Sequence, residues 1–275
     1  MSFRLEVMPV FEDYYGFKNT PFSRTIPIDK LYRGNDADEL TERLKYAAKR
    51  QLFAVLTGEC GVGKTTALRR FTGELKTLEY TCMYISDSKL TPRYFYKGLL
   101  EQLGVVSKWH SGDAKRQLHR EIELLRLDGG QPPVVIIDEA HLLSHDMLEE
   151  VRFLLNFKMD SVSPMALILS GQSELWDKLK LQSYAAIRQR IDIQCGVGRL
   201  DRPQTLEYIK AHLDFAECER EILTEAAIDT VFKFSGGTPR LINKVCISVL
   251  MYGAQNRKSI IDDRMVKLVI DCELS

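Results

Sequence analysis

Short apolar runs alternate with longer stretches of helical spacing over the first two-thirds of the chain. The short runs are bounded by polar or turn residues and predict strands at Gln51–Thr57, Thr81–Ser86, Val134–Ile137, Met165–Ser170 and Ile191–Cys195. The stretches between them repeat apolar residues every three or four positions and predict helices at Lys64–Leu78, Thr91–Gly104, Ala114–Leu127 and Asp146–Phe157. This alternation predicts an α/β fold, with a parallel five-stranded sheet flanked by helices.

The pattern changes after about Leu200. From there the sequence predicts only helices, at Pro203–Phe215, Thr224–Phe234, Pro239–Gln255 and Asp262–Asp271. We therefore predict two domains: an α/β core with an N-terminal extension over residues 1–200, and a small all-helical domain over residues 201–275.

Composition limits the classes of protein that fit. The 275 residues carry 38 basic and 38 acidic side chains, so nucleic-acid binding would need a local patch or patches aligned by oligomerisation. The six cysteines form no C-x-x-C pair or zinc-type cluster, which indicates reduced thiols in the cytoplasm. Neither a signal peptide nor a membrane span is predicted, so we expect a cytoplasmic protein without a membrane partner.

The segment G-E-C-G-V-G-K-T fits the P-loop pattern between a predicted strand and a predicted helix. Its glycines let backbone N–H groups approach phosphate oxygens, and the helix N-terminus favours negative charge. Lys64 is expected to reach the β- and γ-phosphates, and the Thr65 hydroxyl to bind Mg²⁺. ATP and Mg²⁺ are the predicted cofactors. The residues expected to contact the nucleotide are Gly58, Glu59, Cys60, Gly61, Val62, Gly63, Lys64, Thr65 and Thr66.

Two carboxylates follow the buried run V-V-I-I at the carboxyl end of its predicted strand, where open α/β sheets hold ligands. Asp138 is the expected second magnesium ligand, and Glu139 is expected to orient and activate the attacking water. Together these motifs predict an ATPase. The letters D-E-A-H invite a helicase interpretation, but no accompanying helicase motifs follow, and we assign His141 no chemistry.

With both motifs in place, the chain resembles the AAA+ ATPases. More narrowly it resembles the ExeA/GspA-type ATPases and the transposition ATPases of the TnsC, TniB, MuB and IstB kind. The resemblance rests on Tyr14-Tyr15-Gly16-Phe17, Pro21-Phe22, the P-loop, V-V-I-I-D-E-A-H-L-L, M-A-L-I-L-S-G-Q-S-E-L and G-G-T-P-R-L-I-N. It implies a P-loop AAA+ core and a helical lid. The aromatics from Tyr14 to Phe22 would either pack beside adenine or belong to the core.

The resemblance also implies roles for polar residues outside the two motifs. Gln172 matches the sensor 1 position, and Arg240 matches sensor 2, where a guanidinium can bind phosphate. Arg188 and Arg190 compete for the arginine finger, with Arg190 slightly favoured. A finger acts on the neighbouring subunit, so the resemblance implies a homo-oligomer, either a ring or a helical filament.

We expect the ATPase to regulate DNA transposition. It would oligomerise with ATP on double-stranded DNA and recruit or activate a transposase. The motivation is that ExeA-type ATPases typically add a membrane segment and a wall-binding part, neither of which the sequence shows. Candidate DNA contacts are Lys89, Arg93, Lys97, Lys108, Lys115 and Arg116.

Two alternatives compete with transposition. One is an ExeA/GspA-like ATPase that drives assembly of a protein (secretion) complex without DNA. The other is an initiator-type loader, which would need a separate DNA-reading domain. The predicted lid already accounts for the helical C-terminal residues, which argues against the loader.

Overall fold

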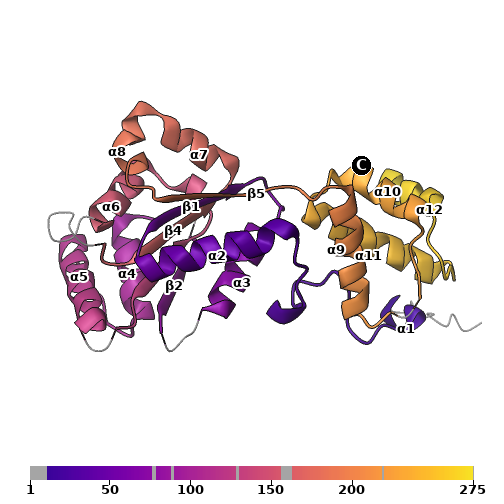
Figure 1. Cartoon of the computed structure of the whole chain (residues 1–275), viewed down its shortest axis with the longest axis horizontal. Coiled ribbons are helices and arrows are strands. Elements are labelled where there is room, and N and C mark those ends of the chain that lie inside the picture. The colour runs from indigo at the N-terminus through magenta and orange to yellow at the C-terminus, as the bar shows by residue number, and fades with distance from the viewer. Residues whose placement is uncertain are drawn as a thin grey trace, which may run out of the picture. The chain divides into compact units, whose positions relative to one another are not determined.

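The computed structural model describes residues 11–75, 79–87, 90–127, 130–155, 163–218 and 220–274. The chain divides into two compact units (Figure 1). The α/β unit comprises Asn35–Cys60 and Lys64–Val197, and the helical unit comprises Met1–Gly34, Gly61–Gly63 and Gly198–Ser275.

The α/β unit contains the predicted parallel sheet. Its strands are β1 (Phe53–Gly58), β2 (Thr81–Ile85), β3 (Pro133–Ile137), β4 (Ala166–Gly171) and β5 (Ile193–Val197), in the spatial order β2-β3-β4-β1-β5. Every neighbouring pair is parallel. The predicted α/β class and the number of strands are therefore confirmed, with boundaries moved by one or two residues.

Alternate residues of each central strand face opposite sides of the sheet, as strand geometry requires. On β1, Ala54 and Leu56 pack with helices α2 (Asn35–Arg50) and α3 (Lys64–Glu74). Phe53 and Val55 pack with the helices of the opposite face. Because both faces are covered, the central strands β3 and β4 and most of β1 are buried, which is why they stand out in the sequence as continuous apolar runs.

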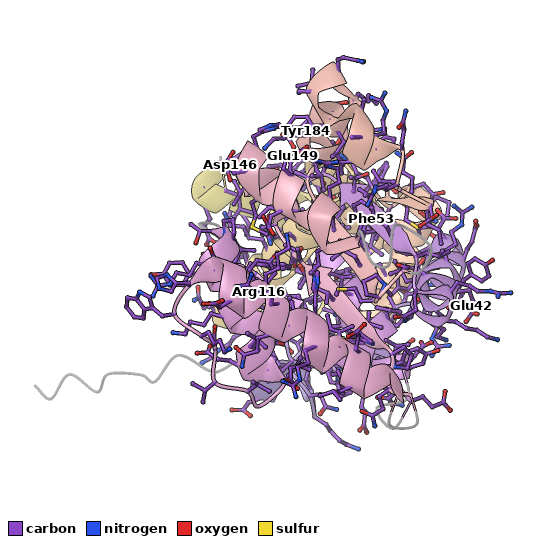
Figure 2. All side chains as sticks on the ribbon, turned by 90° about the vertical axis from the view of Figure 1, so that its left-hand side faces the viewer. Glu42, Phe53, Arg116, Asp146, Glu149 and Tyr184 are labelled. Carbon is purple, nitrogen blue, oxygen red and sulfur yellow. The ribbon has the colours of Figure 1, made fainter. Side chains whose placement is uncertain are left out.

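The second face is covered by α4 (Pro92–Gln102), α5 (Ser111–Leu127), α6 (His145–Leu155), α7 (Ser173–Lys180) and α8 (Ala185–Arg188), with short 3₁₀ turns at Ala140–Leu142 and Gln182–Tyr184. The sequence predicted the start of α4 correctly, because the Thr91 side chain accepts from the backbone N–H of Tyr94 and Pro92 is the first helical residue. Helices α5 and α6 face the viewer in Figure 2, where Arg116 and Glu149 are labelled. The predicted helix end at Phe157 lies outside the described residues.

Helix α2, over residues 35–50, was not predicted from the sequence. Its buried residues Leu40, Leu44, Ala47 and Ala48 recur at helical spacing and line one face. The periodic signal was thus present in the sequence. Helix α7, with buried Leu175 and Leu179, was missed in the same way.

The helical unit contains α1 (Phe11–Tyr15), a 3₁₀ turn at Ile28–Lys30, α9 (Arg202–Phe215), α10 (Glu225–Ser235), α11 (Pro239–Gln255) and α12 (Asp263–Val269), followed by a π-helical turn at Ile270–Leu274. Helix α9 starts with a capping box between Asp201 and Gln204, and α10 ends at Gly236 in the left-handed conformation. These local signals explain why the four helices from α9 to α12 were predictable. No helix in the described part of the chain is long and apolar enough to cross a membrane.

The N-terminal segment groups with the helical unit rather than with the α/β core. Tyr15, Phe17 and Phe22 are buried in the same apolar cluster as residues of α9 to α12. The Tyr15 hydroxyl also donates to the carbonyl of Lys258 at 3.0 Å. This clustering differs from the expected division, which attached the first residues to the core and placed a single boundary near Leu200. Of the two roles considered for these aromatics, the structure shows core packing.

Candidate functional site

The P-loop joins the end of β1 at Gly58 to the start of α3 at Lys64. Gly61 has φ of 81° and Gly63 has φ of 107°, backbone conformations that favour glycine. Such a loop, followed directly by a helix N-terminus, forms a concavity suited to phosphate. The spacing of the motif therefore has a direct backbone reason.

The Lys64 ammonium folds back onto the loop. It donates to the carbonyl oxygens of Gly58 and Glu59, each at 2.9 Å, and the residue is only 8% exposed. Both of these partners are neutral carbonyl oxygens. A buried cation is costly without a counter-charge. The site therefore fits an anionic ligand such as a nucleotide phosphate.

Asp138 accepts four hydrogen bonds although the residue is only 3% exposed. Its Oδ2 accepts from the hydroxyls of Thr65 at 3.1 Å and Tyr84 at 2.9 Å. Its Oδ1 accepts from the hydroxyl of Ser170 at 2.8 Å and from the backbone N–H of Glu139 at 3.0 Å. Hydrogen bonds to both oxygens fix the orientation of the carboxylate.

Strand register explains how distant residues meet at Asp138. Tyr84 belongs to β2 and Ser170 to β4, the two neighbours of β3 in the sheet. The backbone N–H of Asp138 continues the ladder by donating to Ile85 at 2.8 Å. Side chains two residues apart on a strand point to the same side of the sheet, so Asp138 lies on the same side as Ile136. Ile136 packs with residues of α3, and Asp138 therefore lies on the side of the sheet where α3 begins.

The oxygen set at Thr65 and Asp138 fits Mg²⁺. Both ligands are hard oxygens, and they lie 3.1 Å apart. Nowhere in the described residues do three or more His, Cys, Asp or Glu side chains gather into a metal cluster. Magnesium typically uses one or two protein ligands together with substrate phosphates and water. The residues present therefore match a metal that arrives with a nucleotide.

Glu139 occupies the left-handed region, with φ of 53° and ψ of 32°, immediately before the short turn Ala140–Leu142. This conformation is uncommon for a residue with a side chain, and it turns the chain sharply after Asp138. Its side chain is 45% exposed, and Oε2 lies 3.5 Å from Nδ1 of His141. A carboxylate beside the metal-type ligand and open to solvent can reach a water molecule.

His141, to which the sequence gave no role, lies between two candidate residues. Its Nδ1 lies 3.5 Å from Oε2 of Glu139 and 3.5 Å from the backbone nitrogen of Gln172. Gln172 occupies the N-cap position of α7 without a side-chain cap hydrogen bond. The sensor 1 candidate thus follows β4 as expected, and its backbone is near the Glu139 turn.

Tyr84 and Ser170 are the residues that sequence reasoning missed. Burial, followed by the hydrogen bond to Asp138, raises the pKa of Tyr84 to about 12, so its hydroxyl stays protonated and can donate at neutral pH. The signal that could have found both residues is the alternation of side chains along the neighbouring strands, which places them on the same side of the sheet as Asp138. Each stands at the end of a strand adjacent to the one that carries Asp138.

The arginine-finger candidates are both tethered to backbone carbonyls. Arg188 donates to the carbonyls of Leu179 at 3.3 Å and Lys180 at 2.6 Å. Arg190 donates to the carbonyl of Arg152 at 3.2 Å. Their similar tethers favour neither candidate over the other.

Arg240 is the second residue of α11 in the helical unit. Its backbone N–H donates to the carbonyl of Gly61 at 3.2 Å, and its side chain is exposed. The predicted sensor 2 residue is thus placed at a helix start, as the motif G-G-T-P-R-L-I-N indicated.

Three of the six candidate DNA-binding side chains pair with carboxylates. Lys97 pairs with Glu101 at 3.5 Å, Lys115 with Glu150 at 2.6 Å, and Arg116 with Asp113 at 2.5 Å. Burial alone would raise the pKa of Glu150, but hydrogen bonds from Lys115 and Tyr96 lower it overall. The guanidinium of Arg93 lies 4.0 Å from the centre of the Trp109 ring, and Lys108 is exposed. Lys89 lies outside the described residues.

The fold and the P-loop geometry match an α/β AAA+ core. A family model described as an AAA domain matches residues 47–179. The chain is also similar to General secretion pathway protein A of Aeromonas hydrophila, with 30% identity over 244 residues. The match covers 88% of this chain and 44% of that protein, so the chain spans less than half of its relative's length.

Solved structures show the same fold. Drosophila ORC bound to DNA matches with a TM-score of 0.74 and 14% identity, covering 98% of this chain and 67% of that one. Cdc6p from Pyrobaculum aerophilum matches with a TM-score of 0.70 and 15% identity, and the match covers 91% of this chain and 69% of that one. The RuvB Holliday junction branch migration motor of Thermotoga maritima matches with a TM-score of 0.60 and 19% identity, and the match covers 92% of this chain and 72% of that one. At these identities the likeness concerns the fold alone.

The comparisons favour the secretion-type alternative over the transposition hypothesis, because the curated relative is a secretion-pathway protein. The transposition hypothesis relied on further segments being absent from the chain. Since the chain matches only 44% of its relative, that argument no longer separates the two hypotheses.

Proposed function

We propose that this protein is an ExeA/GspA-type ATPase that hydrolyses Mg²⁺-ATP and uses the cycle to drive assembly of a protein complex, such as a secretion complex. The observation that carries the ATPase activity is the contact of Thr65 with Asp138 beside the buried Lys64. The assembly role is supported by the similarity to General secretion pathway protein A.

Each residue of the site has a defined task in this proposal. Lys64 binds the β- and γ-phosphates, exchanging two neutral carbonyl partners for phosphate oxygens. Thr65 and Asp138 hold Mg²⁺, which supplies neutralisation of phosphate charge when bound. Glu139 orients the attacking water and accepts its proton. Gln172 and Arg240 complete the proposal as sensors of the nucleotide's phosphate end.

Hydrolysis in this proposal also needs a second copy of the chain. Arg188 or Arg190 of one subunit would stabilise transition-state charge at its neighbour's phosphates. A ligand that binds at the subunit interface stabilises the assembled form by mass action. ATP therefore favours a homo-oligomer, and hydrolysis loosens it.

The charge distribution favours a protein target over DNA. The chain is neutral overall, and three of the six candidate DNA contacts are paired with carboxylates. Neutralising phosphates requires cations that are available to them. A protein complex places no such demand on the surface.

The test is steady-state ATP hydrolysis by the purified chain with and without double-stranded DNA, alongside mass photometry of the same mixtures. We expect ATP-dependent oligomers and a rate that duplex DNA leaves unchanged. Stimulation by DNA together with assemblies on the duplex would support the transposition hypothesis instead. Lys64→Ala is the control that removes nucleotide-dependent assembly.

A further inference from the structure

Tyr84 contacts the metal-type carboxylate but has no task in the function proposed above. It lies on β2, the strand at one edge of the sheet, and the residue is 41% exposed. Its hydroxyl donates to Oδ2 of Asp138 at 2.9 Å, closer than the 3.1 Å contact from Thr65 to the same oxygen.

The hydrogen bonds at Asp138 are divided equally between its two oxygens. Oδ1 accepts from Ser170 and from the backbone of Glu139, and Oδ2 accepts from Thr65 and Tyr84. A carboxylate held on both oxygens cannot rotate about its last torsion without breaking at least two of these bonds. Without Tyr84, Oδ2 would depend on Thr65 alone, whose hydroxyl is also the expected metal ligand.

We propose that Tyr84 is a positioning residue that fixes Asp138 for the divalent cation of a bound nucleotide. The inference rests on the proposed function and deepens it, because a residue outside both motifs would set the affinity of the site for its metal. Groups that orient a metal ligand typically change metal affinity by about 10–100-fold when removed. Nucleotide contacts to the P-loop itself do not involve Tyr84, so metal-free nucleotide affinity should be independent of it.

The experiment compares wild type with Tyr84→Phe, which keeps the half-exposed ring and removes only the hydroxyl. A fluorescent ATP analogue is titrated in EDTA, and Mg²⁺ is then titrated at fixed nucleotide. We expect unchanged affinity in EDTA and a Mg²⁺ half-saturation raised about tenfold. A half-saturation equal to that of wild type, or an equal loss of affinity in EDTA, would overturn the proposal.

Two further variants keep the result interpretable. Tyr46→Phe removes a phenol hydroxyl from an exposed ring on α2 and should match wild type in both titrations. Tyr84→Ile also removes the hydroxyl and places a residue that suits a strand on β2, so it should raise the Mg²⁺ half-saturation in the same direction. No change with Tyr84→Ile would contradict the proposal if Tyr84→Phe failed to fold. Wild type that binds no nucleotide would refute the ATPase proposal itself, a result distinct from a silent Tyr84→Phe.

Discussion

The hydroxyl of Thr65 lies 3.1 Å from Oδ2 of Asp138, across 73 residues of sequence. Strand β4 separates β1 from β3 in the sheet, yet the loop after β1 brings the first turn of α3 to the end of β3. The two halves of the nucleotide motif therefore form one site.

Replacing Lys64 by alanine should remove most nucleotide affinity. The ammonium is the buried cation of the P-loop, and losing one partner of a buried charge pair costs about 2–5 kcal/mol. We expect a fall in affinity of about thirtyfold or more, measured by titration of a fluorescent ATP analogue. Lys49→Ala, which removes an exposed lysine on α2, is the matched control and should bind as wild type does. Equal affinity in Lys64→Ala would show that the phosphates bind elsewhere.

The arginine finger can be identified by mixing variants. Arg190→Ala and Arg188→Ala should each bind nucleotide normally, and the one that removes the finger should lower hydrolysis about a thousandfold or more. Adding Glu139→Gln subunits, which cannot activate water but still carry the finger, should restore activity to that variant. Phosphate release at a fixed total concentration of protein measures the rescue. If neither variant loses activity, the proposal that Arg188 or Arg190 acts on the neighbouring subunit is wrong.

The stability of the helical unit should fall in mild acid because of His212. Burial lowers the pKa of His212 to about 4 from 6.5, and its Nδ1 accepts from the backbone N–H of Phe22 at 3.0 Å. Between these two pKa values the unfolded chain binds the proton and the folded chain does not. The contribution is therefore fully present above about pH 6.5 and is lost as the pH falls toward 4, by about 2 kcal/mol at pH 5.

Urea unfolding of wild type and His212→Asn at about pH 7.5 and pH 5 measures this term. Asparagine keeps an acceptor for Phe22 but does not titrate in this range. The variant should be less stable at pH 7.5, because the ring contacts with Phe22 and Tyr208 are lost, but it should lose less stability on acidification. Parallel losses in both proteins would exclude His212 as the source.

The motifs and the strands were predictable because their causes are local. The P-loop needs glycine at Gly61 and Gly63, where φ is positive, and the buried strands need continuous apolar runs. Asp138 and Glu139 follow such a run directly. Residue type and spacing are enough to recognise features of this kind in one sequence.

Features that depend on packing between distant segments were not predictable in the same way. Tyr84 and Ser170 reach Asp138 only because β2 and β4 flank β3. The order of strands in a sheet cannot be derived from the sequence of any single strand. The grouping of Phe17 with the C-terminal helices likewise depends on a tertiary contact. The pairing of Lys115 with Glu150 shows why a basic residue alone is a weak signal for DNA.

Phosphate release from ATP by wild type and by Glu139→Gln, at saturating nucleotide and Mg²⁺, tests the central claim most directly. The account predicts Mg²⁺-dependent turnover by wild type. It also predicts a loss of about 10²–10⁴-fold in Glu139→Gln, which should still bind ATP with wild-type affinity. Rapid turnover by Glu139→Gln, or nucleotide binding without any hydrolysis by wild type, would contradict it.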